Sequence, residues 1–488
     1  MNYSMIRYIL SSVICFVGIF LLLPAATAGI YQEKEGFLYL IIGLACMLIG
    51  FWGRRRKPKS SVFYSKEGFA AVALSWIILS LIGALPMYLT GEFPSYIDAL
   101  FETISGFTTT GSSILSDVET LSRGTAFWRC FTHWIGGMGV LVFIMAVMPL
   151  SDSSSMHLMR AESPGPAVGK LVPKVKTTAM ILYGIYVVFT VIEIIALLIA
   201  GMPLFDSMTL TFGTVGTGGF GLLNSSIASY STEVQIIITV FMIICSINFT
   251  VYYMFLIKRP KEALMCEEMR YYLLIVFGSA LLIAFNIRAS FASFGKAFQQ
   301  AIFQVASVIS TTGFATADFN LWPEFSRMIL VLLMFVGACA GSTGGGFKVS
   351  RLIIMVKSVR NEIMSVTHPR SVQKVHMDGR RIPDNVVKTV LCYLAGYVVI
   401  LIVSVLLISL DNFDMTTNFT AVMATFNNVG PGLNRVGPTG NFGGFSVLSK
   451  LVLMFDMLVG RLELYPMLVI FAPGLWRIHP HRHVGKVQ

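Results

Sequence analysis

Four short stretches of the chain each place a glycine after small, hydroxyl-bearing or amide residues. They read IDALFETISGFTTTGSSI around Gly111, FDSMTLTFGTVGTGGFGL around Gly219, FQQAIFQVASVISTTGFAT around Gly313 and TTNFTAVMATFNNVGPGL around Gly430. Backbone carbonyls of extended strands that face one axis can replace the water shell of a cation. Glycine supplies the backbone conformations and the close approach that such a crowded axis requires. The pattern therefore predicts four loops that together coordinate a monovalent cation.

The predicted ion-coordinating residues are each glycine and the two residues before it. They are Thr109, Thr110, Gly111, Thr217, Gly218, Gly219, Thr311, Thr312, Gly313, Asn428, Val429 and Gly430. A small residue also stands six positions before each glycine: Ser105, Gly213, Ser307 and Ala424.

The register of the second stretch is open, because it offers Gly216, Gly218 and Gly219. We align Gly219 with Gly313, since a phenylalanine follows both. The fourth stretch departs most from the pattern, with asparagines and a proline where the others carry Thr, Ser or Phe. A ring of four unlike strands cannot be fully symmetric, so its selectivity can be looser than that of a four-fold channel.

The alternative interpretation is that these stretches are ordinary loop turns, which small polar residues and glycine also favour. Against it, about ten residues before each glycine can form a short helix, and all four stretches lie between apolar segments. Asp98 and Asp206 stand thirteen residues before their glycines, where they suit the start of such a helix. Each short helix would aim its negative C-terminal end at the ion.

The elements that position these loops are apolar. The chain has 488 residues, of which 55% are hydrophobic and 12% charged, and this composition excludes a soluble domain. Apolar segments of about 20 residues can cross a membrane. We predict about ten, at 7–28, 37–53, 68–90, 127–149, 178–200, 233–256, 271–290, 327–347, 387–409 and 448–472.

Charge predicts the orientation of these spans. With both termini cytoplasmic, 27 Lys and Arg fall on the cytoplasmic side and seven on the other, while Arg129 and Arg461 fall within spans. Such an asymmetry supports this topology, and all four loops then enter and leave from the outer face. Dispersed basic residues next to the membrane explain the net charge of +11 better than nucleic-acid binding does. The basic segment 348–388 and the tail 477–488 are candidate sites for a cytosolic regulator or for anionic lipid. The alternative is a solvated run of charges next to the membrane.

The predicted fold is an all-α membrane protein with four pseudo-symmetric helix, pore-loop, helix repeats around one pore, preceded by a two-helix hairpin. The predicted boundaries are 1–60 for the hairpin, 61–160, 161–262 and 263–375 for the first three repeats, and 376–488 for the fourth.

Several motifs together resemble TrkH members of the TrkH/KtrB/HKT superfamily of potassium transporters. They are FETISGFTTTG (101–111), RAESPGP (160–166), TVGTGGF (214–220), STTGFAT (310–316), GSTGGGFK (341–348), FNNVGPGL (426–433) and VGRLELYP (459–466). The resemblance implies K⁺ uptake through one subunit, with K⁺ as the only metal and bound only at the predicted filter residues. It also implies a homodimer in the inner membrane of a prokaryote. A cytosolic TrkA-like subunit, rather than this chain, would bind NAD, ATP or ADP, and no covalent cofactor is expected.

The resemblance also implies a movable gating loop. GACAGSTGGGFK (337–348) interrupts the eighth apolar segment with five glycines, which are costly in a continuous lipid-facing helix. The alternative is a glycine-rich kink used for helix packing. The expected gating residues are Gly341, Ser342, Thr343, Gly344, Gly345, Gly346, Lys348 and Arg461.

Three further residues are open to more than one interpretation. Arg461 would be a cationic barrier beside the gating loop, an ion-pair partner of Asp456 or Glu463, or both. Glu193 lies within a predicted span and is either a proton relay or a packed structural group. His133 is interpreted as a helix-packing residue rather than a ligand.

Two other classes of protein fit the sequence less well. A membrane-embedded enzyme would need His, Asp, Glu or Cys clustered at membrane depth, and the spans contain almost none. An inverted-repeat transporter would have repeats of opposite orientation. The sequence leaves open an ion-coupled (H⁺ or Na⁺) K⁺ symporter and a K⁺/Na⁺ transporter of low selectivity.

Overall fold

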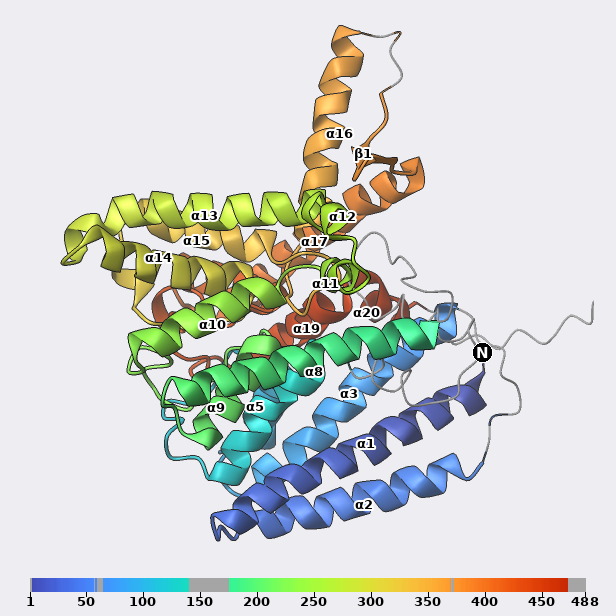
Figure 1. The fold of residues 1–488 in the computed structure, drawn as a ribbon. Helices are drawn as coiled ribbons and strands as arrows, with labels where there is room; N and C mark the ends of the chain where they lie inside the picture. The colour runs from blue at the N-terminus through green and yellow to red at the C-terminus, as the bar shows by residue number, and fades with distance from the viewer. Residues whose placement is uncertain are drawn as a thin grey trace, which may run out of the picture.

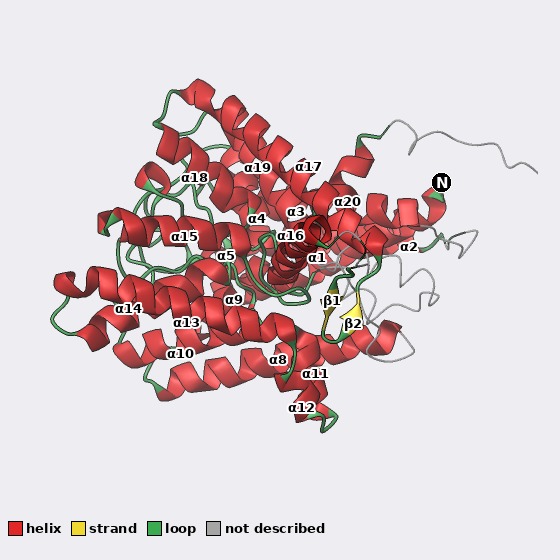
Figure 2. Cartoon of the chain, turned by 90° about the horizontal axis from the view of Figure 1, so that it is seen from above, coloured by secondary structure: helices red, strands yellow, loops and turns green. Residues whose placement is uncertain are grey.

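The computed structural model describes residues 2–56, 58, 65–139, 175–368, 370 and 373–472. The described chain is mostly helical, with one small strand pair beside the helices (Figures 1 and 2). The helices of the first two repeats and the N-terminal hairpin are α1 (Tyr3–Ile30), α2 (Gly36–Arg54), α3 (Ser65–Leu89), α4 (Tyr96–Phe107), α5 (Arg123–Gly137), α8 (Val175–Ile199), α9 (Leu204–Val215), α10 (Thr232–Cys245), α11 (Phe249–Leu256) and α12 (Pro260–Leu264).

The remaining elements belong to the third and fourth repeats. They are α13 (Glu267–Ile287), α14 (Phe294–Ile309), α15 (Glu324–Val336), α16 (Val349–Thr367), β1 (His376–Met377), β2 (Arg380–Arg381), α17 (Asp384–Ile408), α18 (Met415–Phe426), α19 (Val447–Leu462) and α20 (Leu464–Ile470). Short 3-10 turns lie at Arg288–Ser290, Phe319–Leu321, Ser409–Asp411 and Asn434–Val436. The two strands pair antiparallel beside α16, which extends beyond the other helices (Figure 1).

Each short pore helix packs between the two longer helices of its own repeat. In order along the chain, α4, α9, α14 and α18 contact the helices that precede and follow them. The helix that follows each pore helix also packs on the pore helix of the next repeat: α5 packs on α9, α10 on α14, α15 on α18 and α19 on α4. The last contact closes a ring. The N-terminal hairpin α1–α2 packs outside the ring, with α1 against α3 and α5. The predicted all-α fold of four repeats and a hairpin is confirmed.

The pore helices begin where the sequence indicates. Asp98 and Asp206 lie in the first turns of α4 and α9, as predicted. The side chains of Ser95, Ser293 and Asp414 accept backbone hydrogen bonds at the starts of α4, α14 and α18. These caps satisfy donors that have no partner within the helix.

Six described helices are long and apolar enough to cross a membrane, and the bent pair α10 and α11 would add a seventh. The chain is thus a multi-pass membrane protein. The expectation of an unbroken span at 233–256 is wrong, because α10 and α11 meet at a bend of 89°. The span expected at 448–472 is also interrupted, at Glu463, whose φ is 63°. The second half of the span expected at 127–149 lies outside the described residues.

The orientation of the termini and the repeat boundaries stay predictions. The boundaries at 60/61 and 160/161 and the motif at 160–166 lie outside the described residues. The same holds for the end of the chain after residue 472.

Candidate functional site

The four predicted filter loops share one backbone conformation. The residue two positions before each glycine has a left-handed φ: 54° at Thr109, 55° at Thr217, 60° at Thr311 and 55° at Asn428. The glycines themselves have φ values of 80° at Gly111, 80° at Gly219, 85° at Gly313 and 100° at Gly430. Gly219 therefore occupies the same position as Gly111 and Gly313, which agrees with the predicted alignment of the second loop.

One hydrogen bond recurs in every loop and explains the spacing of the small residues. The residue before each filter glycine donates its backbone N–H to the carbonyl of the small residue six positions before that glycine. The bonds are Thr110 to Ser105 at 2.8 Å, Gly218 to Gly213 at 2.7 Å, Thr312 to Ser307 at 2.9 Å and Val429 to Ala424 at 2.8 Å. Each loop is thereby tied to the last turn of its own pore helix.

The loops also contact one another in a closed ring. A Cβ atom added to each filter glycine would meet the carbonyl oxygen of the residue before the glycine of a neighbouring loop. The distances would be 2.1 Å from Gly111 to Gly218, 1.8 Å from Gly219 to Thr312, 2.2 Å from Gly313 to Val429 and 2.7 Å from Gly430 to Thr110. The four carbonyl oxygens thus surround a common centre, and no side chain fits between them.

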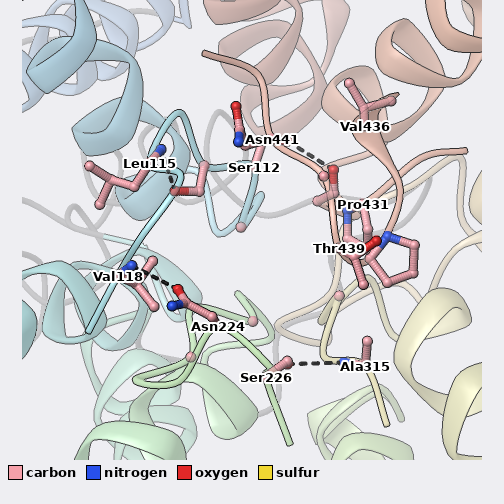
Figure 3. A pocket seen from close by; sticks show the side chains of 18 of the residues that line it. Ser112, Leu115, Val118, Asn224, Ser226, Ala315, Pro431, Val436, Thr439 and Asn441 are labelled. Carbon is pink, nitrogen blue, oxygen red and sulfur yellow. Dashed lines mark hydrogen bonds between the residues drawn. The ribbon is translucent and has the colours of Figure 1, made fainter. Parts of the chain in front are cut away.

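A polar cavity opens at the C-terminal ends of the four loops. It has a volume of about 160 Å³, and all four filter glycines line it. Figure 3 shows side chains from the four loops around it, among them Ser112, Asn224, Ala315 and Thr439. Hydrogen bonds join adjacent repeats here, from Val118 N to Asn224 Oδ1 at 2.9 Å and from Ala315 N to Ser226 Oγ at 3.1 Å (Figure 3).

A buried ion pair braces the first two loops and was not foreseen in the sequence. Glu102 on α4 accepts a hydrogen bond from Arg129 Nε at 2.6 Å and from the backbone of Ile114 at 3.0 Å. Arg129 on α5 also donates to the carbonyl of Gly221 at 3.0 Å. The sequence could have indicated this pair, because Arg129 lies inside a predicted span and a charge there requires a partner.

The segment 337–348 is a loop, and it lies against the other end of the filter. Backbone bonds from Phe347 to Phe335 at 3.1 Å and from Lys348 to Val336 at 3.0 Å close its neck. Gly345 donates its N–H to Thr311 Oγ1 at 2.6 Å. A Cβ on Gly345 would lie 2.6 Å from the carbonyl oxygen of Asn427. The loop therefore touches the third and fourth filter loops at the end opposite the cavity.

The break between α10 and α11 receives the tip of this loop. Cys339 donates to the carbonyl of Ser246 at 3.0 Å, and Phe249 donates to the carbonyl of Gly341 at 3.0 Å. Thr343 Oγ1 donates to the carbonyl of Cys245 at 3.1 Å. Backbone groups freed by the bend are thus satisfied by the loop, which is how a broken helix is tolerated at membrane depth.

Arg461 joins the loop to the first repeat. Its guanidinium donates to the carbonyl of Thr343 at 2.7 Å and to those of Gly136 and Gly137 at 2.6 Å and 2.7 Å. Glu463, one expected partner of Arg461, forms an ion pair with Arg351 at 2.5 Å. The predicted gating residues, including Gly341, Ser342, Thr343, Gly344, Gly345, Gly346, Lys348 and Arg461, thus lie in one place; Lys348 Nζ donates to the carbonyl of Gly344.

Two adjacent glutamates connect the loop to the projecting helix. Glu268 accepts hydrogen bonds from the backbone of Ala340 at 2.7 Å and of Ser350 at 3.0 Å, on either side of the loop. Glu267 pairs with Lys357 on α16, and its backbone N–H donates to Asp378 Oδ1 at 2.7 Å. A displacement of α16 or of the strand pair would therefore disturb the hydrogen bonds that hold both ends of the loop.

Comparison with known proteins places the chain in a family. The family model TrkH, described as cation transport protein, matches residues 40–478. The chain belongs to the TrkH family. It is 35% identical over 477 residues to the Trk system potassium uptake protein TrkH of Escherichia coli K12, covering 95% of this chain and 97% of that one. It is 31% identical to TrkG of the same organism over 460 residues, covering 93% and 94% of the two chains.

A solved structure of the TrkH family has the same fold. The crystal structure of the potassium transporter TrkH from Vibrio parahaemolyticus matches with a TM-score of 0.88 at 30% identity, covering 98% of this chain and 100% of that one. The resemblance to TrkH proteins predicted from the sequence is confirmed, and the relatives are transport proteins rather than enzymes.

Serine at the filter glycines of this TrkH-family chain should disturb the ring in proportion to the crowding at each position. We expect Gly219→Ser to lower the preference for K⁺ over Na⁺ most, by about tenfold or more (~1.4 kcal/mol), and Gly430→Ser least, because its neighbouring carbonyl is farther away. Competition of Na⁺ with radioactive rubidium uptake measures the preference. Gly278→Ser is the control, since nothing lies within 4 Å of its added Cβ. An equal response of the control and the ring positions would contradict this prediction.

Proposed function

We propose that this chain takes up potassium through the ring of filter loops, which acts as a selectivity filter in a channel-like pore. The observation that carries the proposal is the closed contact of each filter glycine with a neighbouring carbonyl oxygen. Such a ring can substitute for the water shell of a K⁺ ion. The relatives named potassium uptake proteins support K⁺ as the cargo. The ion would be held at the filter residues alone.

The pore helices support the same role. α4, α9, α14 and α18 end at Phe107, Val215, Ile309 and Phe426, immediately before the filter loops. Their C-terminal ends carry partial negative charge. Four such ends at one centre favour a cation there over an anion.

We propose further that the loop 337–348 and Arg461 form the gate. The loop lies against one end of the filter, and the guanidinium of Arg461 holds Thr343 to the end of α5. A fixed positive charge at this point would oppose the passage of a cation. Opening would require these hydrogen bonds to break.

We expect a cytosolic TrkA-like subunit to govern this gate. The link from α16 through Glu267 and Glu268 to the loop gives such a partner a mechanical route. Nucleotide would bind to the partner and not to this chain. The homodimer and the cytoplasmic location of both termini stay predictions.

An ion-coupled mechanism is the second candidate, and one observation favours it. Glu193, in α8, is completely buried within a membrane-spanning helix. A carboxyl group at that depth can carry a proton. A TrkH-type pore without coupling needs no such relay, so the two mechanisms make different predictions.

Purified full-length protein in liposomes distinguishes the two mechanisms. We expect radioactive rubidium to enter down its own gradient, and we expect an imposed pH gradient to leave the initial rate unchanged in wild type and in Glu193→Gln. A coupled carrier would accumulate rubidium in response to the pH gradient, and Glu193→Gln would abolish that response. Absence of rubidium uptake in folded wild-type protein would contradict the proposed function itself.

Replacement of Arg461 tests the gate. We expect Arg461→Ala to raise rubidium flux by about tenfold, as a barrier lowered by ~1.4 kcal/mol would. The reason is the loss of both a positive charge and the hydrogen bonds that hold the loop. Arg259→Ala is the control, since Arg259 is exposed and pairs with Glu262 away from the loop. Unchanged flux through folded Arg461→Ala protein would remove the barrier role.

A further inference from the structure

His133 on α5 lies directly behind the second filter loop and is completely buried. Its Nδ1 is 2.8 Å from the carbonyl oxygen of Gly106, and its Nε2 is 3.2 Å from the backbone nitrogen of Phe220. A carbonyl oxygen only accepts and a backbone N–H only donates, so Nδ1 carries the proton and Nε2 accepts. The imidazole is therefore neutral, in a single tautomer, and it joins the end of the first pore helix to the second filter loop.

The first and third filter loops are braced by their own side chains. Thr110 Oγ1 lies 2.8 Å from Thr108 Oγ1, and Thr312 Oγ1 lies 2.7 Å from Ser310 Oγ. All four side chains are buried. In both loops, therefore, the residue before the filter glycine bonds to the residue two positions earlier.

The second loop has glycine at both of these positions, Gly216 and Gly218, and cannot form this bond. The imidazole of His133 occupies the space instead. A Cβ on Gly218 would lie 2.1 Å from the Cγ and 2.2 Å from the Nδ1 of His133. Helix α5 can come this close because a Cβ on Gly137 would lie 2.7 Å from the Cα of Gly216, so only glycine fits there. The neighbouring repeat thus supplies the side chain that the second loop lacks.

Other residues on the same helix hold the following part of the loop. The guanidinium of Arg129 lies 3.6 Å from the ring centre of Phe220, and the Sγ of Cys130 lies 3.6 Å from its carbonyl oxygen. The imidazole of His133 lies 4.2 Å from the ring of Phe220. Together these contacts fix the loop on the side where its own side chains are missing.

We propose that His133 is a positioning residue that sets the preference for K⁺ over Na⁺ at the second filter loop. This inference rests on the proposed function. The carbonyl oxygen of Gly218 abuts Gly111 in the ring, so a shift of the second loop changes the spacing of the oxygens that replace the water shell. Without the imidazole, the Gly218 carbonyl is free to move toward a smaller ion, and Na⁺ competes better.

The alternative is that His133 only fills space. Two variants separate the possibilities in full-length protein reconstituted in liposomes, with Na⁺ competition against rubidium uptake as the readout. His133→Phe keeps an aromatic ring in the space but removes both hydrogen bonds, and His133→Ala removes the ring as well. We expect both to lower the K⁺ over Na⁺ preference, by about tenfold (~1.4 kcal/mol) in His133→Ala. A space-filling role predicts an unchanged preference in His133→Phe.

A double variant supplies a second test that loss of folding cannot mimic. Gly218→Thr alone should lower the preference, because its side chain collides with the imidazole. Combined with His133→Ala, the same threonine no longer meets the imidazole, but Gly216 offers it no hydroxyl partner, so the preference should return to that of His133→Ala alone and not to that of wild type. Full recovery of the wild-type preference in the double variant would show that filled volume suffices without hydrogen bonds, and losses that simply add would show that the imidazole does not occupy this space; either result would overturn the proposal.

A control variant and the wild type distinguish failure of the proposed role of His133 from failure of the proposed function. Trp134→Phe alters the adjacent residue, whose indole bonds to Thr190 and not to the filter, and should leave the preference unchanged. If wild type conducts rubidium and His133→Phe retains its preference, the role of His133 is wrong while the proposed function stands. If folded wild type conducts no rubidium, the proposed function itself is wrong.

Discussion

The contact between each filter glycine and a carbonyl oxygen of the neighbouring loop is the constraint on which the rest of the structure depends. Because the ring must close, each loop has to stand at a fixed distance from the next. The packing of every repeat's second long helix on the next pore helix maintains that distance. The bond from the residue before each glycine to its own pore helix then sets the orientation of the carbonyl groups. Local bonds and contacts between repeats thus serve one geometry.

Sequence divergence among the repeats is compensated by unlike partners. The first and third loops use their own hydroxyl groups. The second loop takes the imidazole of His133 from the first repeat, and the fourth uses Asn428, whose Nδ2 donates to Thr110 Oγ1 and to the carbonyl of Met457, each at 2.9 Å. One backbone conformation is therefore kept by three kinds of bracing, which makes the four sides of the ring chemically different.

Much of this arrangement could be predicted from the sequence, and the rest could not, for physical reasons. Gly111, Gly219, Gly313 and Gly430 reveal the loops because a left-handed, crowded backbone position restricts the residue type. The breaks in the second long helices were partly missed, because hydropathy shows that a segment is apolar but not whether its helix is continuous. The segment at 233–256 is apolar throughout, and its break depends on the distant loop that docks there. The role of His133 was missed because it depends on an absent side chain in another repeat.

The proposed pore requires four carbonyl oxygens to surround the transported ion. The most direct test is to locate rubidium by its anomalous scattering in crystals of the full-length protein. We expect a peak among the carbonyl oxygens of Thr110, Gly218, Thr312 and Val429. Peaks confined to other parts of the protein, with none inside the ring, would contradict it.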